Sequence, residues 1–294
     1  MNRRQFIGRS AMLLAASGIA GQQMFAGVMA KSNKGRIGIQ LYSVKDELSK
    51  DFKGTLKKLS NIGYSYVEPY GFDGEKFFGY TMKEVSDIAK NMGMTVSGSH
   101  INSGILPEDT NAKEWDFWKK CADAIKSGGG KWAIQAGFPV ANTVDDLKRI
   151  AAYFNHAGEI CKKNGVKFAF HNHYEELKKI EGEVILDSIL KMTDPKLVSL
   201  QLDLAHTVNG GGDCIHYLCY YPGRVRLWHA SDFNAASREY TEVGKGSVPY
   251  DTLFNMANLS GLEYLIVEQE TAGDIFASCK ADFDYLKQYK WTKV

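Results

Sequence analysis

Short apolar runs recur along the chain at regular spacing, and amphipathic stretches separate them. Most of the runs are four to six residues long and rich in β-branched or aromatic side chains, as is typical of buried strands. They lie at 37–42, 64–68, 95–100, 132–135, 166–171, 198–203, 225–229 and 264–268. The stretches between them, such as 52–63, 82–93 and 144–165, have helical periodicity, and several end at glycine.

This alternation predicts eight strand–helix units, and therefore an α/β chain that closes into a (β/α)8 TIM barrel. Such a barrel typically needs ~250 residues, and residues 31–294 provide that length. The alternative is an open, doubly wound parallel sheet. That fold would place a glycine-rich phosphate loop after its first strand, and residues 40–44 contain no glycine.

Residues 1–30 have the composition of an export signal. They contain three arginines near the start, a short apolar run at 11–20 and small residues before position 31. The pair Arg3–Arg4, followed by apolar residues, resembles the twin-arginine signal of bacteria. We expect export to the bacterial periplasm; an ordinary Sec signal and an uncleaved anchor are the alternatives.

Composition and charge exclude some classes of protein and some classes of binding partner. The chain is 44% hydrophobic and 24% charged, which excludes disordered and low-complexity proteins. Its formal net charge is +2, but residues 1–30 hold three arginines and no acidic residue, so the remainder carries −1. We therefore expect no nucleic-acid partner and no stable membrane contact once the signal is removed. The sequence does not indicate an oligomeric state.

The five cysteines show no disulfide framework. None belongs to a C-x-x-C pair, and the odd count forbids complete pairing. We interpret them mostly as small buried hydrophobic residues.

Polar side chains gather where the predicted strands end. Five of the seven histidines lie at or just past such an end: His100, His171, His173, His206 and His229. Amides and carboxylates hold the corresponding positions of other strands: Gln40, Glu68, Gln135, Asp203 and Glu268. Because the carboxyl ends of all strands in a parallel barrel point to one face, we expect these groups to converge at one mouth.

Converging imidazoles and carboxylates predict a metal site. Asp203 and Glu268 each end an apolar run. A buried carboxylate without a partner is costly, and a divalent cation would compensate for its charge.

Seven motifs, taken together, resemble the sugar isomerase/epimerase superfamily built on the xylose isomerase-like barrel. The resemblance covers nearly all of residues 36–290. The motifs are GIQLYSVKDE (38–47), YVEPYGF (66–72), FAFHNH (168–173), LQLDLAHTVNGG (200–211), LWHASDF (227–233), TEVGKG (241–246) and LIVEQE (265–270).

The resemblance implies one divalent metal ion bound by residues from strands five to eight. Asp203, His229 and Glu268 match the family's ligands by position. On strand five, where relatives carry glutamate, this chain carries His171, with His173 or Glu176 as rival ligands. Two imidazoles and two carboxylates favour Mn, Zn, Co or Ni over Mg.

The resemblance also implies removal of a proton beside the carbonyl of a small carbohydrate. The candidate bases are Glu68, His100, His173 and Glu268. The candidate substrate-binding residues are Gln40, Tyr42, Gln135, His206 and Lys245, and the aromatic residues Tyr42, Tyr70, Phe72 and Trp228 are candidates for a sugar-facing wall. With a histidine in place of the strand-five carboxylate, two-base epimerisation is less secure. Strand five resembles instead the inosose dehydratase branch and keto-sugar lyases, which eliminate water or an alcohol.

Two other functions remain open: a metal-assisted hydrolase on the same barrel, and a non-catalytic carbohydrate-binding barrel. Sugar phosphates are cytoplasmic, so an exported member would act on a free, oxidised or glycosidic sugar. The Gly-containing stretch 243–247 is the only candidate for a phosphate cradle in this sequence.

Overall fold

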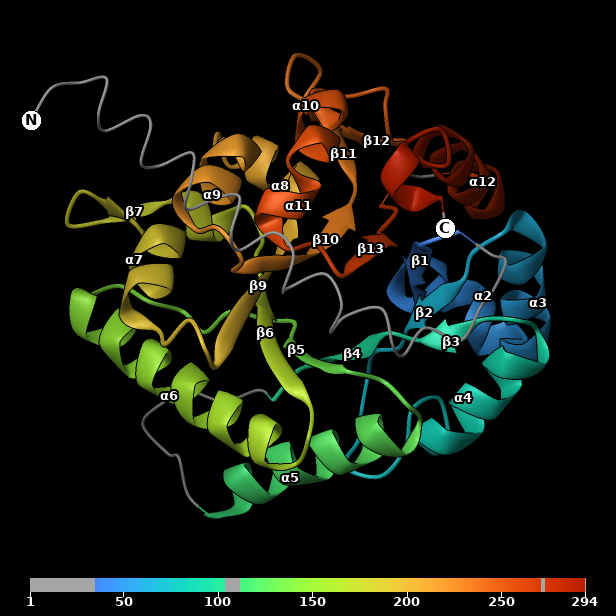
Figure 1. Ribbon diagram of the computed structural model, residues 1–294, viewed down its shortest axis with the longest axis horizontal. Coiled ribbons are helices and arrows are strands. Elements are labelled where there is room, and N and C mark those ends of the chain that lie inside the picture. Colours follow the sequence, from blue (N-terminus) through green and yellow to red (C-terminus); the bar gives the residue numbers. More distant parts are fainter. Residues whose placement is uncertain (1–34, 104–111, 271–272, 294) are drawn as a thin grey trace, which may run out of the picture. The chain divides into compact units, whose positions relative to one another are not determined.

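The computed structural model describes residues 35–103, 112–270 and 273–293 of the 294-residue chain (Figure 1). The export signal predicted for residues 1–30 lies outside these ranges and stays a prediction. Within them, strands and helices alternate along the chain.

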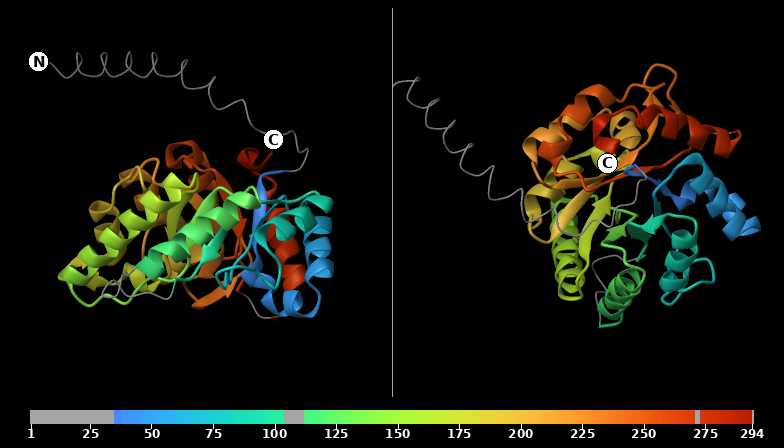
Figure 2. Two further views of the ribbon diagram at one scale, coloured as in Figure 1. Left: turned by 90° about the horizontal axis from the view of Figure 1, so that it is seen from below. Right: turned by 45° about the vertical axis from the view of Figure 1, so that its right-hand side comes forward.

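Nine parallel strands form a nearly closed barrel (Figure 1 and Figure 2). Along the sheet they are β3 (Thr95–Val96), β2 (Tyr66–Glu68), β1 (Ile37–Gln40), β13 (Tyr264–Val267), β10 (Val225–Ala230), β9 (Val198–Asp203), β6 (Lys167–His171), β5 (Trp132–Gln135) and β4 (Gly98–Ile101). The two outermost strands, β3 and β4, are separated only by Ser97, so the sheet returns to where it began. The backbone N–H of His100 then donates to the carbonyl oxygen of Pro69, 2.8 Å away, beyond the end of β2.

The predicted barrel is therefore confirmed, with differences at two strands. The segment predicted at 95–100 is divided at Ser97 into β3 and β4. The first strand stops at Gln40, and Leu41–Val44 forms a short 3₁₀ helix. The cause is local: the side-chain oxygen of Gln40 accepts a hydrogen bond from the backbone N–H of Tyr42, at 3.1 Å, and turns the chain out of the strand.

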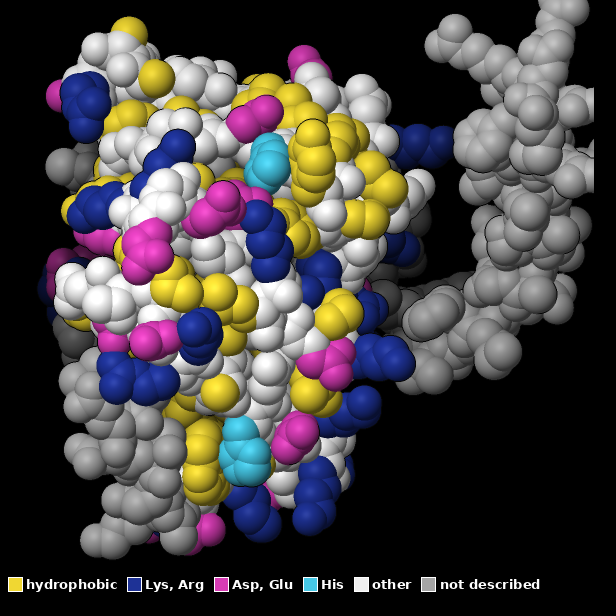
Figure 3. Space-filling view, turned by 90° about the vertical axis from the view of Figure 1, so that its left-hand side faces the viewer, with side chains coloured by type: hydrophobic (Ala, Val, Ile, Leu, Met, Phe, Trp, Pro, Cys, Tyr) yellow, Lys and Arg dark blue, Asp and Glu magenta, His cyan; other side chains and the backbone are white. Residues whose placement is uncertain are grey.

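Helices cover the outside of the barrel (Figure 2). They are α2 (Lys45–Lys50), α3 (Phe52–Ile62), α4 (Met82–Asn91), α5 (Ala112–Ser127), α6 (Val144–Lys163), α7 (Ile185–Met192), α8 (Leu204–Asn209), α9 (Cys214–Tyr220), α10 (Tyr250–Asn255), α11 (Ala257–Ser260) and α12 (Ile275–Leu286). On the side that carries α6 and α7, basic and acidic side chains are interspersed (Figure 3). None of the helices in the described ranges is long and apolar enough to cross a membrane.

The sequence of α6 shows why these helices form where they do. Thr143 and Asp146 make reciprocal hydrogen bonds in a capping box that starts the helix. Buried side chains then recur at helical spacing, from Leu147 through Ile150 to Phe154, and pack toward the sheet. After the helix, Gly165 adopts a φ of 82°, the left-handed conformation that glycine takes without strain.

Side chains fill one end of the barrel interior. A small apolar cluster occupies it, made of Trp132, Ile134, Ala169, Leu227, Tyr264 and Ile266. Trp132 and Tyr264 are the first residues of their strands, so this cluster extends to the amino ends of the strands. The carboxylate of Glu263 accepts hydrogen bonds there from the indole N–H of Trp132 (3.1 Å) and from Lys167 (2.7 Å). The open space therefore lies at the carboxyl ends.

Two short hairpins were not predicted from the sequence: β7 (Lys179–Ile180) with β8 (Glu183–Val184), and β11 (Asp232–Asn234) with β12 (Glu239–Thr241). The second hairpin brings Tyr240 to the mouth of the barrel, where it contacts His206.

Four of the five cysteines are buried, as predicted from the sequence for most of them. These are Cys121, Cys161, Cys214 and Cys279. Cys219, on α9, is exposed.

Candidate metal centre and active-site cavity

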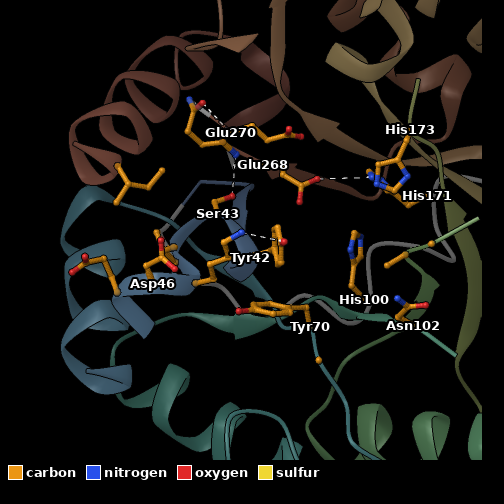
Figure 4. A pocket seen from close by; sticks show the side chains of 18 of the residues that line it. Tyr42, Ser43, Asp46, Tyr70, His100, Asn102, His171, His173, Glu268 and Glu270 are labelled. Carbon is orange, nitrogen blue, oxygen red and sulfur yellow. Dashed lines mark hydrogen bonds and ion pairs between the residues drawn. The ribbon is translucent and has the colours of Figure 1, made fainter. Parts of the chain in front are cut away.

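The predicted polar residues meet at the carboxyl ends of the strands. His100, His171 and His229 lie at or near the ends of β4, β6 and β10. Asp203 ends β9, and Glu268 follows β13 directly. All five are buried. Figure 4 shows His100, His171 and Glu268 around one cavity.

Four of these side chains could hold a metal ion. One ligand atom from each of His171, Asp203, His229 and Glu268 lies within 4.8 Å of the others. Nδ1 of His229 is 2.7 Å from Oε2 of Glu268 and 3.9 Å from Oδ2 of Asp203. Nε2 of His171 is 3.9 Å from the same Glu268 oxygen.

One unpartnered buried oxygen makes the group a good fit to a cation. Oδ1 of Asp203 accepts hydrogen bonds from the backbone N–H of His206 (2.7 Å) and the hydroxyl of Ser231 (2.8 Å). Oδ2 of Asp203 has no hydrogen-bond partner among the described residues. Leaving such an atom buried and unpaired costs free energy that a bound cation would recover. Two nitrogens and two carboxylates also form a donor set that divalent transition metals accept.

Glu68 lies behind His229 rather than in the cavity. Its Oε1 is 2.8 Å from Nε2 of His229. It also accepts hydrogen bonds from the side-chain amides of Gln40 (2.8 Å) and Gln201 (2.9 Å). Oε1 of Gln201 in turn lies 2.6 Å from Nε2 of His100. Glu68 is 1% exposed and does not line the cavity. Its contacts are those of a residue that orients a ligand.

The charges around His229 are strongly coupled. Burial disfavours its charged form, but Glu268 and Glu68 raise the pKa of His229 to about 10. Burial also works against the charge of Glu268, yet His229 lowers the pKa of Glu268 to about 2. Burial raises the pKa of Asp203 to about 6. Without a metal ion, a protonated His229 therefore bridges two ionised carboxylates.

A second group of histidines lines the cavity beside this cluster. Ligand atoms of His171, His173 and His206 also lie within 4.8 Å of one another. Burial and the neighbouring His206 lower the pKa of His173 to about 4, so His173 is neutral at pH 7. Nδ1 of His206 is 2.6 Å from the hydroxyl of Tyr240, and its Nε2 is 3.2 Å from Oε1 of Glu270.

The rival strand-five ligand Glu176 lies outside both groups. It is buried, and its carboxylate accepts a hydrogen bond from the backbone N–H of His173 at 2.6 Å. The structure thus brings His171 into the four-residue group and leaves Glu176 as a support for the following loop.

The cavity has a volume of about 990 Å³. Among the predicted site residues, those that line it are Tyr42, His100, His171, His173, His206 and Glu268. Gln40 is buried against Glu68, and Gln135 is buried with hydrogen bonds to Ser103 and to the carbonyl of Gly137. The side chains of Gln40 and Gln135 therefore support the walls of the cavity and do not line it.

Lys245 does not reach the cavity. Its side chain is 63% exposed and lies 3.4 Å from Glu242. The neighbouring amides, which made 243–247 the candidate phosphate cradle, are already occupied. The Asp232 carboxylate accepts hydrogen bonds from the backbone N–H groups of Gly244 (2.9 Å), Gly246 (3.0 Å) and Val248 (3.1 Å). The loop therefore binds its own carboxylate.

Of the four aromatic candidates for a wall, two line the cavity. Tyr42 and Tyr70 do so. Phe72 is buried and stacks on Phe77 at 4.8 Å, and the indole of Trp228 donates to Ser260 at 3.1 Å, outside the barrel. Trp228 precedes His229 on β10, and successive strand residues face opposite sides, so His229 inside requires Trp228 outside.

Sequence reasoning missed Gln201, Tyr240 and Asp46. Gln201 could have been found from its spacing, because it lies two residues before Asp203 and shares its face of β9. Tyr240 reaches His206 through the β11–β12 hairpin, which carries no motif of its own. Asp46 lines the cavity from α2.

Comparisons with known proteins agree with this architecture. Residues 56–292 match the family model of the xylose isomerase-like TIM barrel. The chain is 26% identical to an inosose dehydratase of Clostridium perfringens over 144 residues, which are 43% of this chain and 48% of that protein. It therefore spans about half the length of the curated relatives it matches.

Solved structures extend the likeness over most of the chain. A sugar phosphate isomerase/epimerase from Parabacteroides distasonis superimposes with a TM-score of 0.80 and 26% identity, over 90% of this chain and 100% of that one. A xylose isomerase-like TIM barrel protein from Mycobacterium smegmatis, in complex with magnesium, has a TM-score of 0.64 at 14% identity over 90% and 99% of the two chains. The latter likeness is one of fold alone. With 56–292 matched by the family model, the chain belongs to the xylose isomerase-like TIM barrel family.

Proposed function

We propose that this protein is a metal-dependent enzyme that removes a proton next to the carbonyl of a carbohydrate and then eliminates water or an alcohol. One observation carries the proposal. A buried carboxylate oxygen, Oδ2 of Asp203, has no hydrogen-bond partner among the described residues and faces three further potential ligands. A buried carboxylate oxygen that no hydrogen-bond donor reaches is a suitable ligand for a cation.

In this proposal His171, Asp203, His229 and Glu268 hold one divalent ion. The donor set favours Mn, Zn, Co or Ni over Mg, which prefers oxygen ligands. When bound, the ion supplies Lewis-acid stabilisation of the negative charge that develops on substrate oxygens. Glu68 fixes His229 from behind through the 2.8 Å contact at Nε2, so that Nδ1 faces the other ligands.

Proton transfer falls to side chains that reach the cavity. His173 lines the cavity, and its lowered pKa leaves it neutral and able to accept a proton at pH 7. His100 lines it too, although the short contact from its Nε2 to Gln201 occupies that nitrogen. His206 lines the same space, and in this proposal it gives a proton to the departing oxygen. The C–H electron pair forms the new double bond as the C–O bond breaks.

Elimination is favoured over two-base epimerisation because of His171. Epimerisation in this family uses carboxylates on strands five and eight as paired proton carriers, and only Glu268 is a carboxylate here. Similarity to inosose dehydratases supports elimination. Similarity to a structure called a sugar phosphate isomerase/epimerase supports the same removal of a proton, but with an isomerised or epimerised sugar as the product.

The test is incubation of metal-loaded protein with a panel of keto-sugars and 3-oxo-sugars in D₂O, followed by NMR. We expect deuterium at a carbon next to the carbonyl and an unsaturated or released product. Deuterium with an inverted or isomerised sugar would assign the isomerase outcome instead. Absence of exchange with every sugar would contradict the proposal, and sugar binding that survives chelation would then favour a binding barrel.

We also propose, from residues 1–30 alone, that the enzyme acts in the bacterial periplasm. Fractionation of cells that express the full chain tests this, with an Arg3→Lys, Arg4→Lys variant as the control. Equal amounts of both proteins in the periplasm would contradict the twin-arginine route.

A further inference from the structure

The cavity is larger than the catalytic cluster at its inner end. Histidines and Glu268 line that inner part, while the outer part is lined by Tyr42, Tyr70, Asp46 and neighbouring residues of α2. In Figure 4, Tyr42 stands between Asp46 on one side and His100 on the other, with Tyr70 beside it. At about 990 Å³, the cavity lies at the upper end of the ~300–1,000 Å³ that encloses drug-sized ligands, which are much larger than one hexose.

The ring of Tyr42 is exposed and yet held in place. Tyr42 is 47% exposed, and it alone among the large exposed hydrophobic residues of the described chain lines the cavity. Nζ of Lys45 lies 4.2 Å from the ring centroid and 3.1 Å from the hydroxyl. The ring of Tyr70 meets it at 5.0 Å and 82°, an edge-to-face contact.

Tyr70 is itself supported from behind. Phe78 packs against it at 4.9 Å, edge to face, and Phe52 lies 5.5 Å beyond Phe78. Phe78 adopts a φ of 53°, a left-handed conformation that is strained for a bulky residue. Such strain persists only where the surrounding packing enforces it, and here the rings of Phe52 and Tyr70 pack on Phe78.

The geometry points to a subsite for a second, uncharged sugar residue at Tyr42, Tyr70 and Asp46, so that the substrate is a glycoside or disaccharide. This inference rests on the proposed function for the inner end of the cavity. The C–H face of a pyranose stacks on the electron-rich face of a tyrosine ring, and a carboxylate such as that of Asp46 accepts hydrogen bonds from sugar hydroxyls.

The charges at the cavity favour a neutral sugar over a phosphorylated one. Lys45 and Lys50 are the only basic residues among the cavity-lining residues that the structure describes. Lys45 contacts Tyr42, and Lys50 is paired with Glu47 at 2.7 Å. Asp46, Glu47, Glu268 and Glu270 line the same space. In the outer part, Asp46 and Glu47 offset the charges of Lys45 and Lys50, so a phosphate dianion would meet no excess of positive charge there.

The experiment measures binding to the metal-loaded full chain by calorimetry. The probes are cellobiose, maltose and lactose, with glucose, galactose and glucose 6-phosphate for comparison. We expect at least one disaccharide to bind roughly tenfold more tightly than its component monosaccharides, and glucose 6-phosphate to bind no more tightly than glucose. Tyr42→Ala should abolish the disaccharide advantage, and Tyr42→Trp should retain it.

Tyr220→Ala is the matched control, because Tyr220 is 73% exposed on α9 and does not line the cavity. The subsite is overturned if no disaccharide exceeds its monosaccharides, if Tyr42→Ala keeps the advantage, or if glucose 6-phosphate binds best. Failure of the proposed function is a separate result. It would abolish deuterium exchange in the wild-type protein, whereas an absent subsite would leave exchange of the wild-type protein with a monosaccharide substrate intact.

Discussion

Oε1 of Glu68 lies 2.8 Å from Nε2 of His229, and both side chains are buried. The other ring nitrogen, Nδ1, faces Glu268 and Asp203. One carboxylate thus fixes the ring from behind and leaves the opposite nitrogen directed toward the candidate metal centre. Such outer contacts fix the orientation and tautomer of a ligating histidine.

Replacing Glu68 by glutamine should weaken metal binding by about 10–100-fold, the usual cost of losing an outer partner of a ligand. The amide cannot accept from Gln40, Gln201 and His229 as the carboxylate does. Competition with a metal-sensitive dye measures the affinity. Glu176→Gln is the control, because Glu176 is buried but lies outside the four-residue group, and it should bind metal as the wild type does. Equal weakening in both variants would refute the role assigned to Glu68.

Metal uptake should release about one proton near pH 7.5. His229 has a pKa of about 10 in the metal-free protein and must lose its Nδ1 proton to bind a cation, whereas Asp203, with a pKa of about 6, is already ionised. Affinity should therefore rise about tenfold per pH unit between pH 6 and pH 10, and more steeply below pH 6. Calorimetry in buffers of different ionisation enthalpy counts the protons. A count near zero at pH 7.5 would be inconsistent with His229 as a ligand.

His171→Glu should shift metal preference toward Mg²⁺. The change replaces an imidazole by a third carboxylate in the four-residue group, and Mg²⁺ favours oxygen ligands. We expect the ratio of Mg²⁺ to Zn²⁺ affinity to rise by roughly tenfold or more. His156→Glu, on the outer helix α6, makes the same change away from the cavity and should leave the ratio unaltered. An unchanged ratio in His171→Glu would argue against His171 as a ligand.

Asp232→Ala should destabilise the fold by about 2 kcal/mol or more, since each buried group left without a partner costs ~1–3 kcal/mol and two of the four donors, Phe233 and Val248, are buried. The carboxylate accepts from Gly244, Gly246 and Val248, and from its neighbour Phe233. Urea unfolding measures the loss. Asp232→Asn keeps one acceptor oxygen, so its free energy of unfolding should lie between those of the wild type and Asp232→Ala. If Asp232→Ala unfolds at the wild-type urea concentration, the loop is not held by this carboxylate.

Much of this architecture could be predicted from the pattern of apolar runs. The runs at 132–135 and 198–203 coincide with β5 and β9, and the polar residues that follow the strands do converge. These predictions depend on local chain properties: strand length, helix capping and the common direction of parallel strands.

Contacts between segments that are far apart in the sequence could not be predicted. The position of Glu68 behind His229 depends on how the interior of the barrel is filled, and the two residues are 161 positions apart. The amides at 243–247 look available in the sequence, but the tertiary fold pairs them with Asp232. The position of Trp228, in contrast, could have been predicted. Successive residues of β10 face opposite sides, so Trp228 lies outside the barrel if His229 lies inside.

Anomalous diffraction from crystals grown with Mn²⁺ tests the central claim most directly. We predict a single strong peak at the cluster, within coordination distance of Oδ2 of Asp203, Nδ1 of His229, His171 and Glu268. An ion held instead by His173, His206 and Glu270, or no ion in the cavity at saturating Mn²⁺, would contradict the account.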